Sequence, residues 1–187
     1  NHLNSLYTLD PNTVFKTAEF VFTYSNNGLG KASRNFHEWA RNHELCDGHG
    51  TRLTLLNNWE NTFFDFDEPL LGKLMKEAKE LGVDLFLLDD GWFGNNHPRN
   101  DDHAGLGDWE VMKSKLPNGI PQLVKFAKEA GVKFGIWIEP EMVNPRSDLF
   151  EKHPDWAITL PNRETYYYRN QLVLDLANPE VQDFVFG

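Results

Sequence analysis

Apolar and polar residues follow two different periods along the chain, and the change from one to the other marks helices and strands. Twice, an amphipathic run with helical spacing stops at a glycine, and a valine then opens a continuous apolar run. This pattern predicts helices that end at Gly82 and Gly131, each followed by a buried strand. Aligning the two glycines places Glu139 in the register of Asp90, so acidic residues fall at equivalent strand ends.

Two further segments fit the same pattern less closely. One is a strand that begins near residue 53 and precedes a helix over 68–81, and the other is a strand over 171–175 before a helix that opens near Pro179. Strands that alternate with helices form parallel βα units with right-handed crossovers. Four such units predict an α/β fold, the first half of a (β/α)8 TIM-type barrel, over residues 51–187. Because half a barrel leaves two open edges, we expect the chain to be part of a longer enzyme.

The first 50 residues follow a different pattern. Residues 20–24 alternate weakly like a strand, residues 26–28 have turn chemistry, and residues 31–43 have helical spacing. We interpret residues 1–50 as the end of a preceding β-rich domain and a helix that links it to the barrel.

Composition and charge exclude several classes of protein. The chain has 18 basic against 28 acidic residues and a net charge of −10, which argues against a nucleic acid as partner. No apolar stretch approaches the roughly 20 residues of a membrane helix, and the first residues do not resemble a signal peptide. The first residue is not Met, so an export signal could lie upstream. Cys46 is the only cysteine, which excludes an internal disulfide and is compatible with a reducing cytoplasm.

Asp89 and Asp90 are the leading candidates for function. They follow the apolar run 85–88, which is typical of a strand buried on both faces, and ligands bind at such strand ends in barrels. Gly91 can bend the backbone so that both carboxylates face the barrel mouth. Burying two adjacent carboxylates is costly unless hydrogen-bond donors compensate them, and sugar hydroxyls are such donors. In the alternative interpretation, one carboxylate caps the following loop and the other is solvated.

Two tryptophans, two glutamates and an arginine extend this candidate site. Trp59 and Trp137 could stack on the apolar face of a sugar ring, or they could belong to the core. Glu139 and Glu141 place two more acids at a strand end, although they could form a surface pair. Arg169 could donate a forked hydrogen bond to a sugar oxygen or to a site carboxylate, or it could be a surface arginine.

The loop over residues 93–118 is long for a compact domain and rich in polar and turn-forming residues, so we expect it to wall the pocket. We expect no metal there, because its candidate ligands lack the spacing of a zinc site. These ligands are His97, Asp101, Asp102 and His103. Residues 28–32 lack the first glycine and the Ser/Thr of a phosphate-binding loop, and no Gly-x-Ser-x-Gly motif of a serine hydrolase occurs.

Five motifs occur in order: Asn57-Asn-Trp59-Glu, Leu87-Leu-Asp-Asp-Gly-Trp-Phe93, Gly107-Asp-Trp109, Gly135-Ile-Trp-Ile-Glu-Pro-Glu-Met142 and Arg169-Asn-Gln-Leu-Val-Leu-Asp-Leu-Ala-Asn-Pro179. Together they resemble the retaining α-galactosidases of glycoside hydrolase family 36, and the resemblance covers nearly the whole chain. It implies an N-terminal β-sandwich domain before the barrel and a small β domain after it. Residues 1–50 would then be the end of the β-sandwich domain.

The resemblance also implies roles for the candidate site residues. Asp89 and Asp90 would bind the outer hydroxyls of a terminal galactose, and Arg169 would contact the site from the next strand region. Trp59 and Trp137 would shape the pocket. The catalytic residues of the family are an aspartate nucleophile in a Lys-Trp-Asp-x-Asn motif and a second aspartate that acts as acid and base. Neither motif occurs in the sequence, so we expect no catalytic residue in this chain and place both beyond its last residue, Gly187.

By resemblance, the intact enzyme would release terminal α-galactose from melibiose-type and raffinose-type oligosaccharides by double displacement. We expect a cytoplasmic, bacterial-type enzyme that forms a homo-oligomer, needs no cofactor and has no membrane or nucleic-acid partner. We expect the chain alone to be inactive. The alternatives are a non-catalytic sugar-binding or structural fragment, a related α-galactosyl transferase, and an α-N-acetylgalactosaminidase.

Overall fold

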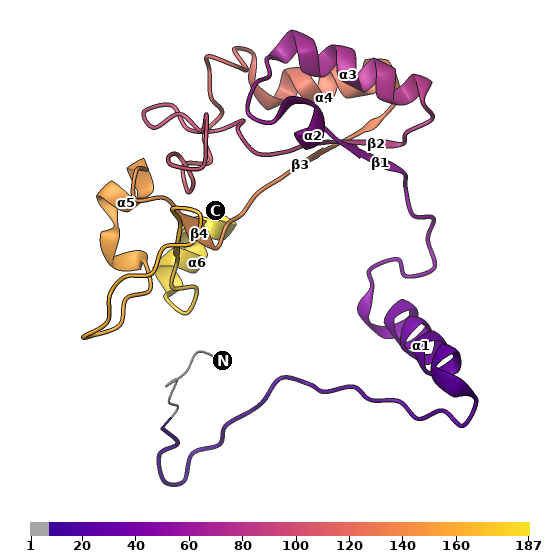
Figure 1. The fold of residues 1–187 in the computed structure, drawn as a ribbon, viewed down its shortest axis with the longest axis vertical. Coiled ribbons are helices and arrows are strands. Elements are labelled where there is room, and N and C mark those ends of the chain that lie inside the picture. Colours follow the sequence, from indigo (N-terminus) through magenta and orange to yellow (C-terminus); the bar gives the residue numbers. More distant parts are fainter. Residues whose placement is uncertain (1–7) are drawn as a thin grey trace. The chain divides into compact units, whose positions relative to one another are not determined.

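The computed structural model describes residues 8–187, and the chain forms two compact units that divide after Arg52. In the first unit, helix α1 (Gly28–Trp39) continues directly into a π-helix (Ala40–Glu44) (Figure 1). These two segments confirm the helix that the sequence predicts over residues 31–43.

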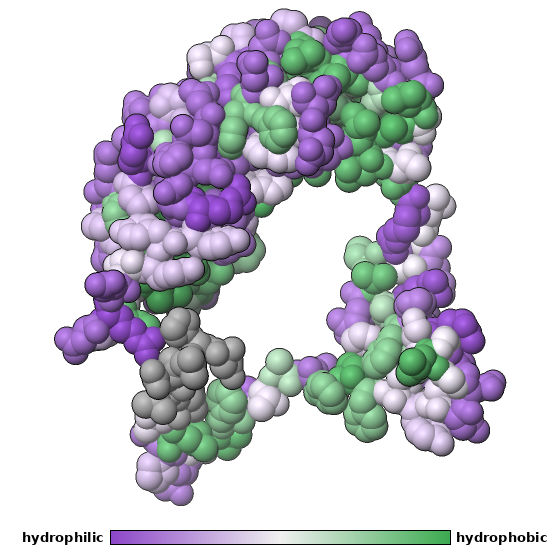
Figure 2. All heavy atoms as spheres, viewed as in Figure 1, coloured by the Kyte–Doolittle hydropathy of each residue, from purple (hydrophilic) through white to green (hydrophobic). Residues whose placement is uncertain are grey.

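The segment before α1 differs from its prediction. Residues 20–24 form no strand, because a β-ladder needs a partner and no described residue pairs with this segment. The side chains of Phe20, Phe22 and Tyr24 are exposed, and Figure 2 shows hydrophobic residues along this part of the chain. That residues 1–50 belong to a β-sandwich domain stays a prediction.

Three parallel strands form the sheet of the second unit, and Figure 1 shows them side by side. They are β1 (Leu55–Asn57), β2 (Leu85–Leu88) and β3 (Lys133–Ile136), with β2 in the centre. Their parallel pairing confirms three of the four parallel strands predicted from the sequence.

The register of β2 and β3 differs by one residue from the prediction. Leu88 pairs with Ile136, whereas aligning the two glycines would pair it with Trp137. Two residues separate Gly82 from β2, but only one separates Gly131 from β3. The turns between helix and strand are therefore not identical in the two units.

Two helices cover one face of this sheet, and they lie side by side in Figure 1. They are α3 (Glu68–Glu80) and α4 (Gly119–Ala130), and a single-turn helix, α2 (Trp59–Thr62), follows β1. The Asp67 side chain accepts a hydrogen bond from the Leu70 N–H and so caps the start of α3.

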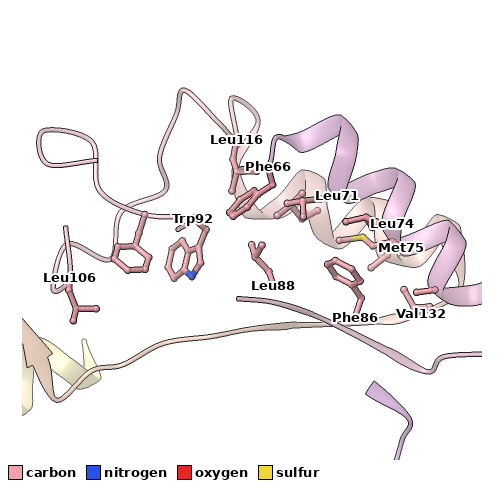
Figure 3. Packing of buried hydrophobic residues seen from close by; sticks show 14 residues of the cluster. Phe66, Leu71, Leu74, Met75, Phe86, Leu88, Trp92, Leu106, Leu116 and Val132 are labelled. Atoms are coloured by element: carbon pink, nitrogen blue, oxygen red, sulfur yellow. The ribbon is translucent and has the colours of Figure 1, made fainter. Parts of the chain in front are cut away.

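Buried apolar residues fill the space between the sheet and the two helices (Figure 3). Phe86 and Leu88 of β2 are fully buried, whereas Leu85 and Leu87 on its other face are only partly buried. The two-sided burial predicted for β2 is therefore incomplete within the described chain. The helix α3 contributes Leu71, Leu74 and Met75 to this core.

The fourth predicted strand is present but pairs differently. Strand β5 (Leu172–Val173) lies antiparallel to β4 (Met142–Val143), whereas the sequence predicted a parallel strand over 171–175 in the same sheet as the others. The chain turns between β3 and β4, so β4 supplies the backbone partners that β5 needs.

A second, smaller core surrounds β4 and β5. Helix α5 (Asp148–Lys152), a 3-10 turn (Pro154–Trp156) and α6 (Pro179–Phe186) pack there, and α6 confirms the helix predicted near Pro179. The buried residues of this core are Val143, Leu149, Trp156, Ala157, Leu172, Leu174 and Val181. Across residues 8–187, the helices are all too short or too polar to cross a membrane.

Candidate functional site

Asp89 lies at the carboxyl end of β2, next to the corresponding end of β1. The Asn57 side-chain amide donates a hydrogen bond to Asp89 Oδ2, and the Asp90 N–H donates to Asp89 Oδ1 over 2.7 Å. The Asp89 N–H in turn donates to Asn58 Oδ1 over 2.8 Å. These hydrogen bonds fix the Asp89 carboxylate. Because Asp89 is only partly buried, the residue remains accessible at the surface.

Asp90 is buried and bound by an arginine of the long loop. The Arg99 guanidinium donates from Nε to Asp90 Oδ1 over 2.9 Å and from Nη2 to Oδ2 over 2.8 Å. This bidentate geometry is the strongest that an arginine and a carboxylate form. Asp90 is therefore not a solvated acid, and its burial is compensated within the chain itself.

Gly91 provides the bend that the sequence predicts after the two aspartates. Its φ of 99° lies in the left-handed region, which other residues rarely adopt. A Cβ atom at this position would lie 2.9 Å from Cδ1 of Phe64. Both conformation and space therefore require glycine here.

The Arg99 side chain is completely enclosed. Its Nη1 donates to Asn144 Oδ1 over 3.0 Å and to the Ala104 carbonyl over 3.3 Å. Its guanidinium also lies 5.7 Å from the centre of the Phe64 ring and 5.9 Å from that of Phe93, within reach of cation–π attraction. All three guanidinium nitrogens therefore have partners.

Asp102 connects this buried pair to Arg169. The Arg169 Nη2 donates to Asp102 Oδ1 over 3.0 Å, and Arg99 Nη2 lies 3.5 Å from the same oxygen. The hydrogen bond to Asp102 raises the pKa of Arg169 above its ordinary value, so this side chain stays cationic. The structure thus links Asp90 and Arg169, two of the predicted site residues, through a loop that lies between them in the sequence.

Glu139 belongs to the same electrostatic neighbourhood. Burial raises the pKa of the Glu139 carboxyl, the charge of Glu141 raises it further, and the charges of Arg169 and Arg99 act in the opposite direction. The Gln171 side-chain amide donates to Glu139 Oε2 over 3.4 Å. Glu139 therefore holds its proton to a higher pH than an ordinary glutamate.

The two predicted tryptophans lie in separate aromatic clusters. Trp59 contacts Phe63 and Phe64 edge-on, with ring centres 5.2 and 4.9 Å apart. Trp137 stacks on Phe93 at 6.4 Å and contacts Trp109 edge-on. Both indoles are partly exposed, so each packs against the protein on one side and keeps surface for a ligand.

The loop over residues 93–118 is a packed part of the second unit. Leu106 and Leu116 are fully buried, and the Lys115 ammonium donates to the Phe64 carbonyl over 2.7 Å and to the Gly91 carbonyl over 3.1 Å. Burial lowers the pKa of Lys115. The loop therefore holds the turn that follows Asp89 and Asp90.

The four metal-ligand candidates of this loop do not come together. His103 pairs with Asp101, Asp102 binds Arg169, and His97 reaches α5 instead. Within residues 8–187, the group with suitable spacing is formed by His97, Asp148 and Glu151, whose ligand atoms lie within 4.8 Å of one another. His97 Nε2 lies 2.8 Å from Glu151 Oε1 and 3.6 Å from Asp148 Oδ1, so these residues connect the loop to α5 and have the spacing to hold a divalent cation.

Sequence reasoning missed Arg99 and Asn144, and it considered Asp102 only as a metal ligand. An arginine in a loop has no periodic pattern that would reveal its partner, and Asn144 lies 45 residues from Arg99. The one signal available was the cost of burying Asp90, which requires a cation somewhere in the fold.

Comparison with known proteins gives consistent matches. The melibiase family model matches residues 14–187. Alpha-galactosidase AgaA from Geobacillus stearothermophilus is 45% identical over 99% of this chain and 25% of its own length, and alpha-galactosidase Mel36A from Lactobacillus acidophilus is 42% identical over 100% and 25%. Crystal structures of AgaA variants with raffinose and with stachyose superpose with a TM-score of 0.81 at 46% identity, over 87% of this chain and 22% of theirs.

These matches bear on the fold and on the extent of the chain. They confirm the predicted fold class, a partial α/β barrel of the TIM type, because the matching structures are family 36 α-galactosidases. The chain spans about a quarter of the length of the curated relatives it matches.

Proposed function

Because the chain belongs to the melibiase family, we propose that it forms the galactose-recognition part of a retaining α-galactosidase. The proposed substrates are α-galactosides of the raffinose and stachyose type, since crystal structures of related AgaA variants contain these oligosaccharides. We assign residues 1–50 to the end of a β-sandwich domain with its linking helix, and residues 51–187 to the N-terminal half of the catalytic barrel.

The observation that carries this proposal is the set of fixed polar groups at the carboxyl end of β2. Asp89 presents a partly exposed carboxylate, and Arg169 presents an exposed guanidinium that donates from Nη2 to Asp102, which uses one of its five N–H donors. Asp89 and Arg169 are connected through Asp90, Arg99 and Asp102: Asp90 binds Arg99, and Arg99 lies beside Asp102, which binds Arg169. Carboxylate acceptors and a forked donor suit the hydroxyls of one sugar ring, and Trp59 and Trp137 supply partly exposed apolar surface.

The same geometry separates recognition from catalysis. A retaining glycosidase needs two carboxyl groups about 5–5.5 Å apart, one to attack the anomeric carbon and one to protonate the leaving oxygen. Asp90 is buried with both of its oxygens bound to Arg99, and Asp89 is held as a hydrogen-bond acceptor at the strand end, which supports recognition and not nucleophilic attack for this pair. We therefore assign the nucleophile and the acid/base to other parts of the enzyme. This chemistry requires no metal or organic cofactor.

Two further properties are proposed for the intact enzyme. It is a cytoplasmic protein, which the single, exposed Cys46 supports because an oxidising compartment favours paired cysteines. It acts on oligosaccharides without a nucleic-acid or membrane partner, which the net charge of −10 supports. By its resemblance to family 36 enzymes, we propose that it is a homo-oligomer.

Replacing both aspartates tests the proposed function. In the intact enzyme, Asp89→Ala with Asp90→Ala should lower kcat/KM for p-nitrophenyl α-galactoside by about a hundredfold to ten-thousandfold, because each hydrogen bond to a charged group contributes roughly 1.5–3 kcal/mol. Glu164→Ala, at an exposed acid of the same chain, is the matched control. Turnover in the double variant equal to that of the control would contradict the assignment. A preference for the α-N-acetylgalactosaminide would instead identify the related hexosaminidase.

A further inference from the structure

We propose that Arg99 is a positioning residue for galactoside recognition, which holds the Asp90 carboxylate directly and the Arg169 guanidinium through Asp102. The inference rests on the proposed function, because it deepens the description of the same site. It assigns to the loop over residues 93–118 the task of fixing Asp90, whose N–H binds the Asp89 carboxylate, and of holding the Arg169 guanidinium.

The first support is the burial of the Arg99–Asp90 pair. Their side chains are 0% and 4% exposed, so neither charge can be compensated by solvent. A buried carboxylate whose partner is removed is strongly destabilised and either moves or takes up a proton. The orientation and charge of Asp90 therefore depend on Arg99.

The second support is the shared oxygen of Asp102. Arg169 and Arg99 approach the same Oδ1 atom at 3.0 and 3.5 Å, and a carboxylate held between two guanidinium groups has little freedom to rotate. The side chains of Asp102 and Arg169 are 36% and 46% exposed, so Arg169 keeps accessible surface outside this contact. The position of the Arg169 guanidinium is thus tied to Arg99 by one intervening side chain.

The third support is the backbone that carries Arg169. Arg169 and Asn170 have φ values of 51° and 59°, in a two-residue turn closed by hydrogen bonds between Tyr168 and Gln171. Residues other than glycine rarely adopt this conformation, and it persists only where surrounding contacts determine it. Here the Asn144 side chain donates to the Asn170 carbonyl over 2.9 Å and accepts from Arg99 through its Oδ1.

Asn144 therefore makes a second connection between the loop and the turn. The same amide nitrogen donates to the Asp102 carbonyl over 3.1 Å, and the same Oδ1 accepts from the Leu106 N–H over 2.9 Å. Both routes from the turn, through Asp102 and through Asn144, end at the Arg99 guanidinium. A guanidinium is required for this arrangement, because a lysine ammonium lacks the planar fork that serves several acceptors at fixed angles.

The test compares three variants in the intact enzyme. Arg99→Lys keeps the charge but loses the fork, Asp102→Asn breaks the link to Arg169 but leaves the Asp90 pair, and Arg146→Lys changes an exposed arginine as control. Steady-state kinetics with p-nitrophenyl α-galactoside, inhibition by 1-deoxygalactonojirimycin and thermal unfolding are measured for each. Because recognition is altered, Arg99→Lys should raise KM and weaken inhibition about tenfold to hundredfold, while kcat changes less. Asp102→Asn should raise KM several-fold, and the control should match the wild type.

A fourth variant distinguishes positioning from simple loss of stability. Arg99→Ala leaves a space of guanidinium shape, so added millimolar guanidinium should restore part of its kcat/KM, and it should not do so in Asp90→Ala. If Arg99→Lys and Asp102→Asn keep the wild-type KM, even with a lowered unfolding temperature, the role of Arg99 is structural and the inference is wrong. A wild-type enzyme without α-galactosidase activity would instead overturn the proposed function on which the inference rests.

Discussion

Asp89 and Asp90 are adjacent in the sequence but have different surroundings. Asp90 is enclosed with Arg99, whereas Asp89 is partly exposed and accepts hydrogen bonds from Asn57 and the backbone. The apolar run before them predicts that both lie at a strand end, and the cost of burying a carboxylate predicts that a donor is near. This cost does not identify Arg99 as the donor, because a contact made by a loop side chain leaves no periodic pattern in the sequence.

Glu139 gives a prediction at the scale of a single residue. Its pKa is raised in the folded protein, chiefly by burial, so its contribution to stability is fully present below the pKa of the unfolded state and is lost as the pH rises through the folded value. Glu139→Gln cannot ionise and avoids this loss. Thermal unfolding of the intact enzyme should therefore show Glu139→Gln more stable than wild type at pH 7 and about equal to it at acidic pH.

The exposed neighbour Glu141 provides the matched comparison for this prediction. Glu141→Gln removes the like charge that raises the pKa of Glu139. The variant should therefore lose stability at a lower pH than the wild-type enzyme does. An equal effect of Glu139→Gln at neutral and acidic pH would contradict the assigned cause.

At the scale of elements, the sequence predicts what is local and misses what is not. The helices α3 and α4 and the strands β2 and β3 follow from spacing and from glycine stops, and the structure confirms them. The partner of β5 and the one-residue shift between β2 and β3 depend on backbone groups far apart in the sequence. Residues 20–24 have strand spacing but no partner among the described residues, and spacing alone does not form a ladder.

Lys115 gives a prediction about the long loop as an element. Its ammonium serves the carbonyls of Phe64 and Gly91 and lies 4.9 Å from the centre of the Phe66 ring. Lys115→Met would leave these carbonyls without their donor, at about 1–3 kcal/mol for each buried group that stays unpaired. Urea unfolding of the intact enzyme should show a loss of about 2–4 kcal/mol. Lys113→Met, at an exposed position of the same loop, should change the stability little, and equal losses in both variants would exclude the assigned role.

At the scale of the whole molecule, the sheet of the second unit is incompletely covered. Leu53 and Leu55 are exposed near β1, and Ile138 is exposed beyond β3, so the described residues leave apolar surface around the sheet unburied. The family relatives are about four times as long as the part of them that this chain matches. Parallel barrels bury both faces of their strands, which accounts for the apolar run that the sequence shows in β2.

The separation of recognition from catalysis predicts how the chain of residues 1–187 behaves by itself. Asp90 is buried against Arg99 and the chain contains no Lys-Trp-Asp-x-Asn motif, whereas double displacement needs two carboxyl groups at a defined separation. Purified chain that shows helical circular dichroism should therefore release no p-nitrophenol from p-nitrophenyl α-galactoside above the buffer rate, under conditions in which the intact enzyme is active. If the chain hydrolyses the substrate and Asp89→Asn or Glu139→Gln abolishes that activity, a carboxylate of this chain performs the chemistry. Recognition and catalysis would then lie in the same part of the barrel.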